Sequence, residues 1–162
     1  MSQYSLVTRW HLDAPIERVW ETLVAVEDWP RWWRFVWNVV EIEKGNPDGT
    51  GSLRHFVWSG RLPYRLAFKI RTTAVRRPTF IEGVAAGELN GVGRCHLTAI
   101  GATTLVRYEW TVSTAKRWMN LLAPFLEPAF RWNHQQVMAE GGRGLAQYLG
   151  VSLIGMEDLS SR

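Results

Sequence analysis

The chain has 162 residues, of which 46% are hydrophobic and 21% are charged, a composition typical of one globular domain and not of a disordered or fibrous protein. Its formal net charge of +4 comes from dispersed lysines and arginines, a pattern that disfavours nucleic acid as a partner. The single cysteine, Cys95, excludes an internal disulfide and is typical of a reducing compartment. No apolar run approaches the ~20 residues of a transmembrane segment, and residues 1–5 lack a signal-peptide core, so we expect a cytoplasmic protein.

The first predicted elements are one strand and two short helices. Tyr4–Leu12 alternates between apolar and polar residues, which predicts a strand. Pro15 suits the first turn of the amphipathic helix that follows and that reaches about Leu23. A second short helix is predicted from about Pro30, inside the segment Trp29–Trp37, which contains four tryptophans.

From Trp37 onward the apolar residues recur with a period of two, which predicts a series of strands. Short connections rich in Gly, Asn, Pro and Asp join them, so an antiparallel meander is expected. The sequence leaves open which face of the second and fourth of these strands points inward. In chain order the predicted strands are Trp37–Lys44, Gly51–Trp58, Tyr64–Thr73, Thr79–Ala86, Glu88–Ile100 and Thr103–Val112.

The chain then leaves the sheet for its last predicted elements. A connection over 113–123 carries four apolar residues that we expect to form a lid, Trp118, Met119, Leu121 and Leu122. A long helix is predicted from about Pro124 or Pro128 to Leu149, and three glycines in it, Gly141, Gly142 and Gly144, are expected to allow close approach to the sheet. Residues 1–150 are thus predicted to be a single domain, and residues 151–162 a flexible tail.

This order of elements is an α+β layout in which a curved sheet buries one face against a single long helix and leaves a pocket between them. The sequence also resembles the START-like helix-grip superfamily (SRPBCC), and within it the polyketide cyclase/dehydrase and lipid-transport group. The resemblance covers the chain from Ser5 to about Leu149. The residues that carry it are Ala14–Trp20, Trp29–Trp33, Gly49–Gly51, Leu62–Tyr64, Gly87–Leu89 and Trp132–Gly141.

The resemblance implies a helix-grip fold, a curved antiparallel sheet wrapped around the long C-terminal helix, with a deep apolar tunnel between the two. Members of the superfamily bind lipids, sterols, plant hormones, quinones or polyketide intermediates, and a minority catalyse cyclisation, dehydration or hydrolysis. Cys95 stands where relatives commonly have tryptophan, which implies an enlarged or reshaped cavity. Fold alone does not choose among these activities.

The leading hypothesis is binding of a hydrophobic small molecule, such as a lipid, a polyketide-like compound or another aromatic or polycyclic molecule. The predicted walls are Tyr64, Leu66, Phe68, Tyr108 and Trp110 on strands and Phe130, Asn133, His134 and Val137 on the helix, with Trp33 at the mouth together with Trp118. The other indoles of Trp29–Trp37 are expected to plug one end of the core. Two alternatives remain: a polyketide cyclase or dehydratase, and a regulatory or interaction protein with a vestigial pocket.

In the enzymatic alternative, His134 is the general acid/base and a tyrosine assists it. Against this, His134 could instead be hydrogen-bonded to a neighbouring strand or exposed beside Arg131. Glu82 is similarly open, because it is either a carboxylate with a raised pKa among apolar neighbours or a surface charge. The four histidines show no metal-ligand spacing, and dinucleotide and phosphate-loop motifs are missing, so neither a metal nor a cofactor is predicted. Monomer and homodimer both remain open.

Overall fold

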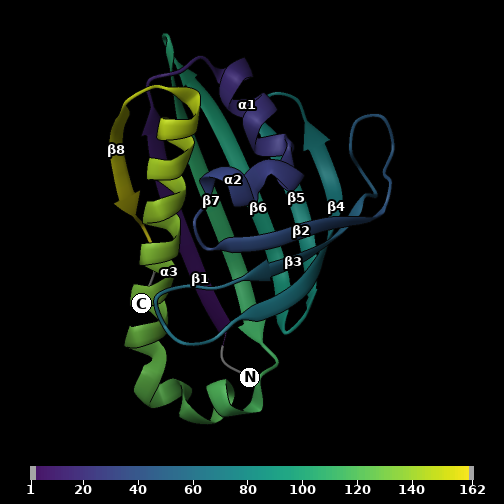
Figure 1. Cartoon of the computed structure of the whole chain (residues 1–162), viewed down its shortest axis with the longest axis vertical. Coiled ribbons are helices and arrows are strands. Elements are labelled where there is room, and N and C mark those ends of the chain that lie inside the picture. Colours follow the sequence, from purple (N-terminus) through teal and green to yellow (C-terminus); the bar gives the residue numbers. More distant parts are fainter. Residues whose placement is uncertain (1–2, 161–162) are drawn as a thin grey trace.

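The structure is a computed structural model that describes residues 3–160; the predicted domain and tail also include residues 1–2 and 161–162, which lie outside this range. The elements in chain order are β1 (Gln3–Leu12), α1 (Ile16–Val24), the 3-10 helix η1 (Val26–Asp28), α2 (Trp29–Trp32), β2 (Val36–Glu43), β3 (Leu53–Trp58), β4 (Leu66–Arg76), β5 (Phe80–Gly87), β6 (Leu89–Ile100), β7 (Thr103–Thr114), α3 (Arg117–Leu149) and β8 (Leu153–Asp158). The strands form one eight-stranded sheet in the order β2-β3-β4-β5-β6-β7-β1-β8. The sheet curves around α3, with α1 and α2 beside that helix (Figure 1). The predicted α+β helix-grip fold is confirmed.

The alternating sequences of the central strands decide which face is covered. On β7, Val106, Tyr108 and Trp110 are buried, whereas Arg107 is exposed. Neighbouring strands are antiparallel and place directly paired residues on the same face, so Leu97 lies beside Val106 on the inner side. The inner face of these central strands is therefore apolar and packs against the helices, while their outer face carries charged residues.

The pairing also settles the two faces that the sequence left open. Phe56 on β3 pairs with Phe68 on β4, and the two rings stack at 5.8 Å on the inner face. On β5, Ile81 pairs with the inward-facing Cys95, so its neighbour Glu82 points outward.

The outward position of Glu82 decides between its two interpretations. Its carboxylate accepts hydrogen bonds from the Thr73 hydroxyl at 2.8 Å and from Arg94 at 2.8 Å. These two interactions lower the pKa of Glu82, with the Thr73 bond as the larger cause. Glu82 is therefore an ionised group of the outer face and not a carboxyl held among apolar neighbours.

Helix α3 begins earlier than the sequence indicates. The predicted connection over 113–123 is helical from Arg117, and both Pro124 and Pro128 lie inside the helix. A proline removes one backbone donor and bends a helix without necessarily ending it. Consistent with this, the first part of α3 runs in a different direction from the rest (Figure 1).

The predicted flexible tail is wrong for Leu153–Asp158, which forms strand β8. Gly150 has a left-handed φ of 69° and terminates α3, with its N–H donated back to the last helical turn. The chain then returns beside β1, where Thr8 pairs with Asp158 and Arg9 forms a salt bridge with Glu157 at 2.6 Å. Because β1 is otherwise the last strand of the sheet, β8 supplies partners for backbone groups that β7 does not reach.

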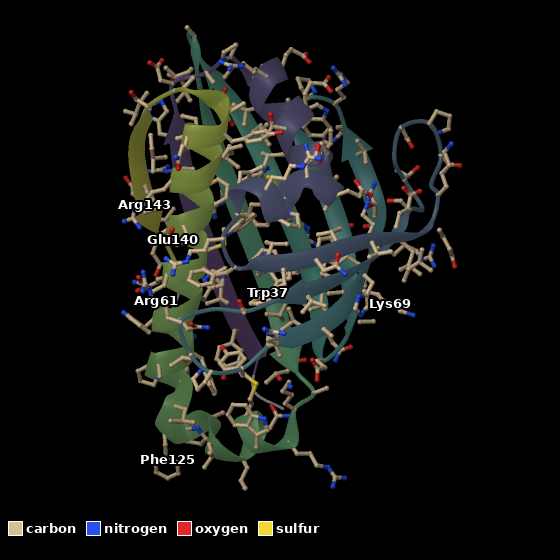
Figure 2. The ribbon with its side chains drawn as sticks, viewed as in Figure 1. Trp37, Arg61, Lys69, Phe125, Glu140 and Arg143 are labelled. Carbon is tan, nitrogen blue, oxygen red and sulfur yellow. The ribbon has the colours of Figure 1, made fainter. Side chains whose placement is uncertain are left out.

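At the opposite edge of the sheet lies β2. Its pairing with β3 has two irregularities, one between Val36 and Asn38 and one between Glu41 and Glu43. Its apolar residues Trp37, Val40 and Ile42 are exposed, and Trp37 lies on the outside of the strand (Figure 2). This end of the sheet therefore finishes in an irregular strand.

Three tryptophans of the tryptophan-rich segment, Trp29, Trp32 and Trp33, lie in the core. Trp33 is fully buried, and its Nε1 donates to the carbonyl oxygen of Val137 on α3 at 2.8 Å. The ring centroid of Trp33 lies 5.4 Å from that of Trp10 and 4.8 Å from that of Trp58. Trp33 thus joins the sheet to the long helix inside the core and, contrary to the prediction, does not reach the cavity, whereas Trp37, which was expected to plug the core, is exposed.

The three glycines of α3 allow the helix to pack closely against this cluster. A Cβ on Gly141 would stand 2.4 Å from the Trp33 ring, and one on Gly142 would stand 3.0 Å from the Trp10 ring. A Cβ on Gly144 would stand 1.8 Å from the carbonyl oxygen of Trp32. The predicted close approach to the sheet exists at Gly142, which meets Trp10 of β1, whereas Gly141 and Gly144 approach Trp33 and the α2 backbone.

Candidate ligand-binding site

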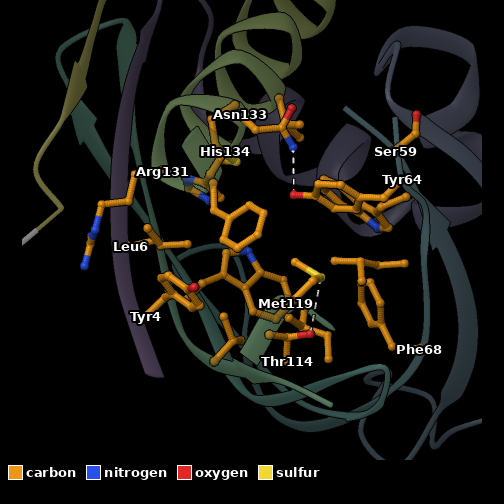
Figure 3. A pocket seen from close by; sticks show the side chains of 18 residues that line it. Tyr4, Leu6, Ser59, Tyr64, Phe68, Thr114, Met119, Arg131, Asn133 and His134 are labelled. Atoms are coloured by element: carbon orange, nitrogen blue, oxygen red, sulfur yellow. Dashed lines mark hydrogen bonds between the residues drawn. The ribbon is translucent and has the colours of Figure 1, made fainter. Parts of the chain in front are cut away.

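A cavity of about 130 Å³ lies between α3 and the inner face of the sheet (Figure 3). Strands β1, β3, β4, β6 and β7, the segment that joins β3 to β4, and α3 all contribute side chains to its wall. The lining residues are Tyr4, Leu6, Trp58, Ser59, Tyr64, Leu66, Phe68, Leu89, Trp110, Val112, Thr114, Met119, Phe130, Arg131, Asn133, His134, Val137 and Met138. The wall is mostly apolar, with a few polar groups, which is the usual composition of a small-molecule pocket.

The structure brings together most of the residues that the sequence indicates. Those that line the cavity are Tyr64, Leu66, Phe68, Trp110, Phe130, Asn133, His134 and Val137. Two do not. Trp33 belongs to the aromatic core described above, and Tyr108 lines a second, smaller cavity of about 70 Å³ between the sheet and the short helices.

Cys95 lies in the wall of that second cavity, opposite Tyr108 in the ladder between β6 and β7. Its small side chain leaves space where a larger residue would fill the interior. Burial raises the pKa of the Cys95 thiol far above its ordinary range, so the thiol stays protonated and is a poor nucleophile.

The sequence did not predict several of the residues in and around the wall. Tyr4 and Leu6 lie on the predicted inner face of β1, but their place at the cavity depends on the pairing of β1 with β7, where Leu6 lies opposite Trp110. Met119 was predicted to belong to a lid and lines the wall from α3. Trp118 packs at the rim, with its ring centroid 6.0 Å from that of Tyr64. Strand register and the early start of α3 would have been needed to place these residues.

Asn133 organises one side of the cavity. Its Oδ1 accepts hydrogen bonds from the backbone N–H of Arg61 at 2.7 Å and of Leu62 at 3.1 Å. Its Nδ2 donates to the hydroxyl oxygen of Tyr64 at 3.0 Å (Figure 3). All of these partners belong to the segment between β3 and β4, so one buried amide fixes that segment to α3. A Cβ on Gly60 would stand 2.5 Å from this amide, and the segment needs glycine there.

A salt bridge outside the cavity also connects the segment between β3 and β4 to α3. Arg61 lies 3.8 Å from Glu140 on α3, and Glu140 also lies 3.6 Å from Arg143. The three side chains gather along one side of the helix (Figure 2). The ion pairs are partly exposed and add little stability, but they orient the segment that carries Tyr64.

His134 is held neutral. Burial lowers the pKa of His134 to about 4, an effect that Asp158 opposes and Arg131 reinforces. Within residues 3–160, neither ring nitrogen has a hydrogen-bond partner, and both are buried. The imidazole is therefore not hydrogen-bonded to a neighbouring strand, and at neutral pH it offers one donor and one acceptor inside the cavity.

This lowered pKa makes stability depend on pH. The unfolded chain binds a proton at His134 near the ordinary pKa of about 6.5, whereas the folded chain does so only near 4. Protons therefore favour the unfolded chain as pH falls through this window, and we expect His134 to lower the free energy of unfolding by about 2 kcal/mol between pH 7 and pH 5. Urea unfolding at a series of pH values measures this loss.

A His134→Leu variant should lack this loss of stability between pH 7 and pH 5. The control variant His55→Leu, which changes a histidine outside the cavity wall, should still show the loss. Equal pH profiles for the wild type and His134→Leu would contradict the assignment.

Together, the curved antiparallel sheet, the long helix held against it and the apolar cavity between them define a START-like helix-grip protein. The sequence matches the family model "Polyketide cyclase / dehydrase and lipid transport" over residues 3–150, and the chain belongs to this family. No curated protein matches the chain.

Solved structures show the same fold at low sequence identity. A START superfamily protein from Mycobacterium smegmatis is 12% identical with a TM-score of 0.74, covering 91% of this chain and 97% of its own. The Zhui aromatase/cyclase from Streptomyces sp. R1128 is 12% identical with a TM-score of 0.68, covering 92% and 94%. A major latex-like protein from Panax ginseng is 11% identical with a TM-score of 0.69, covering 90% and 97%. At such identities the likeness concerns the fold alone.

The described part of the chain contains neither a membrane-spanning helix nor a metal-binding group of side chains. None of its helices is both long and apolar enough to cross a membrane. Across residues 3–160, no group of three or more His, Cys, Asp and Glu side chains is arranged to hold a metal ion.

Proposed function

We propose that the protein binds a hydrophobic small molecule in the cavity between α3 and the sheet. The observation that carries the proposal is the cavity itself, which is a mostly apolar space of about 130 Å³ between α3 and the sheet. Protein cores contain few voids larger than a water molecule. A vestigial pocket would be filled by side chains, so the retained space favours binding over a purely structural or interaction role.

The enzymatic alternative receives less support from the same residues. A cyclase or dehydratase needs a proton acceptor whose pKa lies near the working pH, and the pKa of His134 is about 4. The neutral imidazole is better suited to hydrogen-bond a ligand than to remove a proton from one. Incubation with aromatic β-keto substrates tests this choice, because turnover by the wild type that is lost in His134→Leu would favour catalysis.

A pair of matched substitutions tests binding. Val112 on β7 lines the cavity, whereas Val84 on β5 is exposed on the outer face. Val112→Trp is expected to fill the cavity and weaken ligand binding by about tenfold or more, since an indole takes the space of the ligand. Val84→Trp adds the same side chain outside the cavity and should leave the affinity unchanged.

Two measurements detect ligand binding. Native mass spectrometry of protein purified from its own host shows whether an apolar molecule is retained, and calorimetric titration with indane or naphthalene measures the affinity of the cavity. Binding that survives Val112→Trp would place the ligand elsewhere. A bare protein mass together with no response to either hydrocarbon would overturn the proposed function.

A further inference from the structure

Buried polar atoms without partners concentrate at the cavity. Within the described residues, the cavity-lining side chains with such atoms are Tyr4 through its hydroxyl, Trp58 through Nε1, Arg131 through Nη1 and His134 through both ring nitrogens. A buried polar atom that lacks a hydrogen bond destabilises a protein by about 1–3 kcal/mol. Several of them in one mostly apolar wall indicate that a ligand supplies their partners.

Most of this unfilled capacity consists of donors. The indole N–H of Trp58 and the hydroxyl of Tyr4 have nothing to donate to within residues 3–160. The Tyr64 hydroxyl already accepts from Asn133 at 3.0 Å, so its own proton remains available for another acceptor. Burial raises the pKa of both Tyr4 and Tyr64, which keeps the two phenols protonated. The complementary ligand group is an oxygen that accepts hydrogen bonds.

The charges around the cavity balance one another. Among the described residues of the wall, Arg131 is the one arginine or lysine, and its Nε lies 2.9 Å from the carboxylate of Glu127. His134 adds no charge at neutral pH because of its low pKa. A charged ligand would lose its hydration in this apolar space without gaining an unpaired counter-charge. The site is therefore matched to an uncharged ligand.

The wall also indicates a flat ligand of limited size. Its aromatic members are Tyr4, Trp58, Tyr64, Phe68, Trp110 and Phe130. The rings of Tyr4 and Tyr64 both meet Phe130 edge-on, at centroid distances of 6.5 Å and 6.0 Å, and rings in this arrangement favour another aromatic ring as a neighbour. An apolar cavity of roughly 150 Å³ holds benzene, so the volume of about 130 Å³ here holds about one ring, and because the cavity is only partly enclosed, a fused second ring can extend toward its opening.

We propose that the ligand is an uncharged aromatic compound of one or two rings that carries a carbonyl oxygen, and that Tyr64 and Tyr4 donate hydrogen bonds to this oxygen. The inference rests on the proposed function and specifies the chemistry of the same site. The Tyr4 hydroxyl points into the cavity, and the Tyr64 hydroxyl is held in place by Asn133 (Figure 3).

Three compounds with one scaffold test this chemistry by calorimetric titration: indane, 1-indanone and indane-1-carboxylate. We expect 1-indanone to bind at least as tightly as indane, although the ketone is better hydrated in water, and the carboxylate to bind far more weakly. Tyr64→Phe and Tyr4→Phe should each weaken 1-indanone binding by about three- to tenfold, as for the loss of one neutral hydrogen bond, and leave indane binding unchanged.

The variants keep the rings and so preserve the packing against Phe130. Tyr148→Phe, at an exposed position on α3 outside the wall, is the matched control and should change neither affinity. Equal affinities of wild type and both cavity variants for 1-indanone would overturn the inference, as would tighter binding of the carboxylate than of the ketone. If indane binds in those cases the proposed function stands, whereas failure of all three compounds to bind, together with a bare protein mass, contradicts both proposals.

Discussion

Replacing Trp33 by alanine is expected to lower the free energy of unfolding by about 3–5 kcal/mol, the range for removing a large buried aromatic side chain. The indole is fully buried and touches the rings of Trp10 and Trp58. Its loss also removes the hydrogen bond to the carbonyl of Val137. Both the cavity left behind and the lost hydrogen bond add to the loss of apolar burial.

Urea unfolding followed by far-UV circular dichroism measures this change. Trp37→Ala is the control, since Trp37 belongs to the same segment but is 55% exposed, and it should change stability by less than about 1 kcal/mol. A stability loss at Trp33 as small as that at Trp37 would contradict the assignment of Trp33 to the core. Loss of ligand affinity without loss of stability would instead support the original prediction that Trp33 reaches the ligand.

Gly144→Ala is expected to destabilise the protein by about 3 kcal/mol, at the upper end of what overpacking causes. Helix propensity alone predicts the opposite sign, because alanine stabilises a helix interior by about 1 kcal/mol relative to glycine. The difference arises because the new Cβ would stand 1.8 Å from the carbonyl oxygen of Trp32. A backbone atom cannot rotate away, so α2 and α3 would have to separate.

The control for this substitution is Gly155→Ala on β8, where an added Cβ meets nothing within 4 Å. Thermal and urea unfolding of both variants compare the two sites directly. A neutral or stabilising Gly144→Ala would show that α2 and α3 are not in contact as described.

The sequence predicted the parts of the fold whose residues alternate strongly. The inner face of β7 follows from the spacing of Val106, Tyr108 and Trp110, and the helix-grip class follows from the order of elements and from the family resemblance. The sequence could not place Leu153–Asp158, because this short apolar run gains its role only from β1, which lies far away in the chain. Long-range pairing of this kind leaves no local signal.

The sequence predicted the types of residue that line the candidate site better than it predicted the place of each individual residue. A tryptophan that faces a cavity and one that packs in the core can have the same spacing in the sequence. The sequence therefore could not distinguish Trp33 from Trp58 or Trp110. The unfilled hydrogen-bonding capacity of Tyr4 and His134 is a property of the packed interior and has no counterpart in spacing. These are the features that narrow the ligand from any hydrophobic molecule to a class of compounds.

The irregular edge strand β2 has a consequence for how copies of the protein meet. A regular edge strand offers a row of free backbone N–H and C=O groups to which a second sheet can add, and such addition leads to aggregation. The two irregularities of β2 interrupt that row, and Glu41 and Glu43 place negative charges along it. The exposed apolar side chains Trp37, Val40 and Ile42 are thus carried on a strand that resists edge-to-edge growth of the sheet.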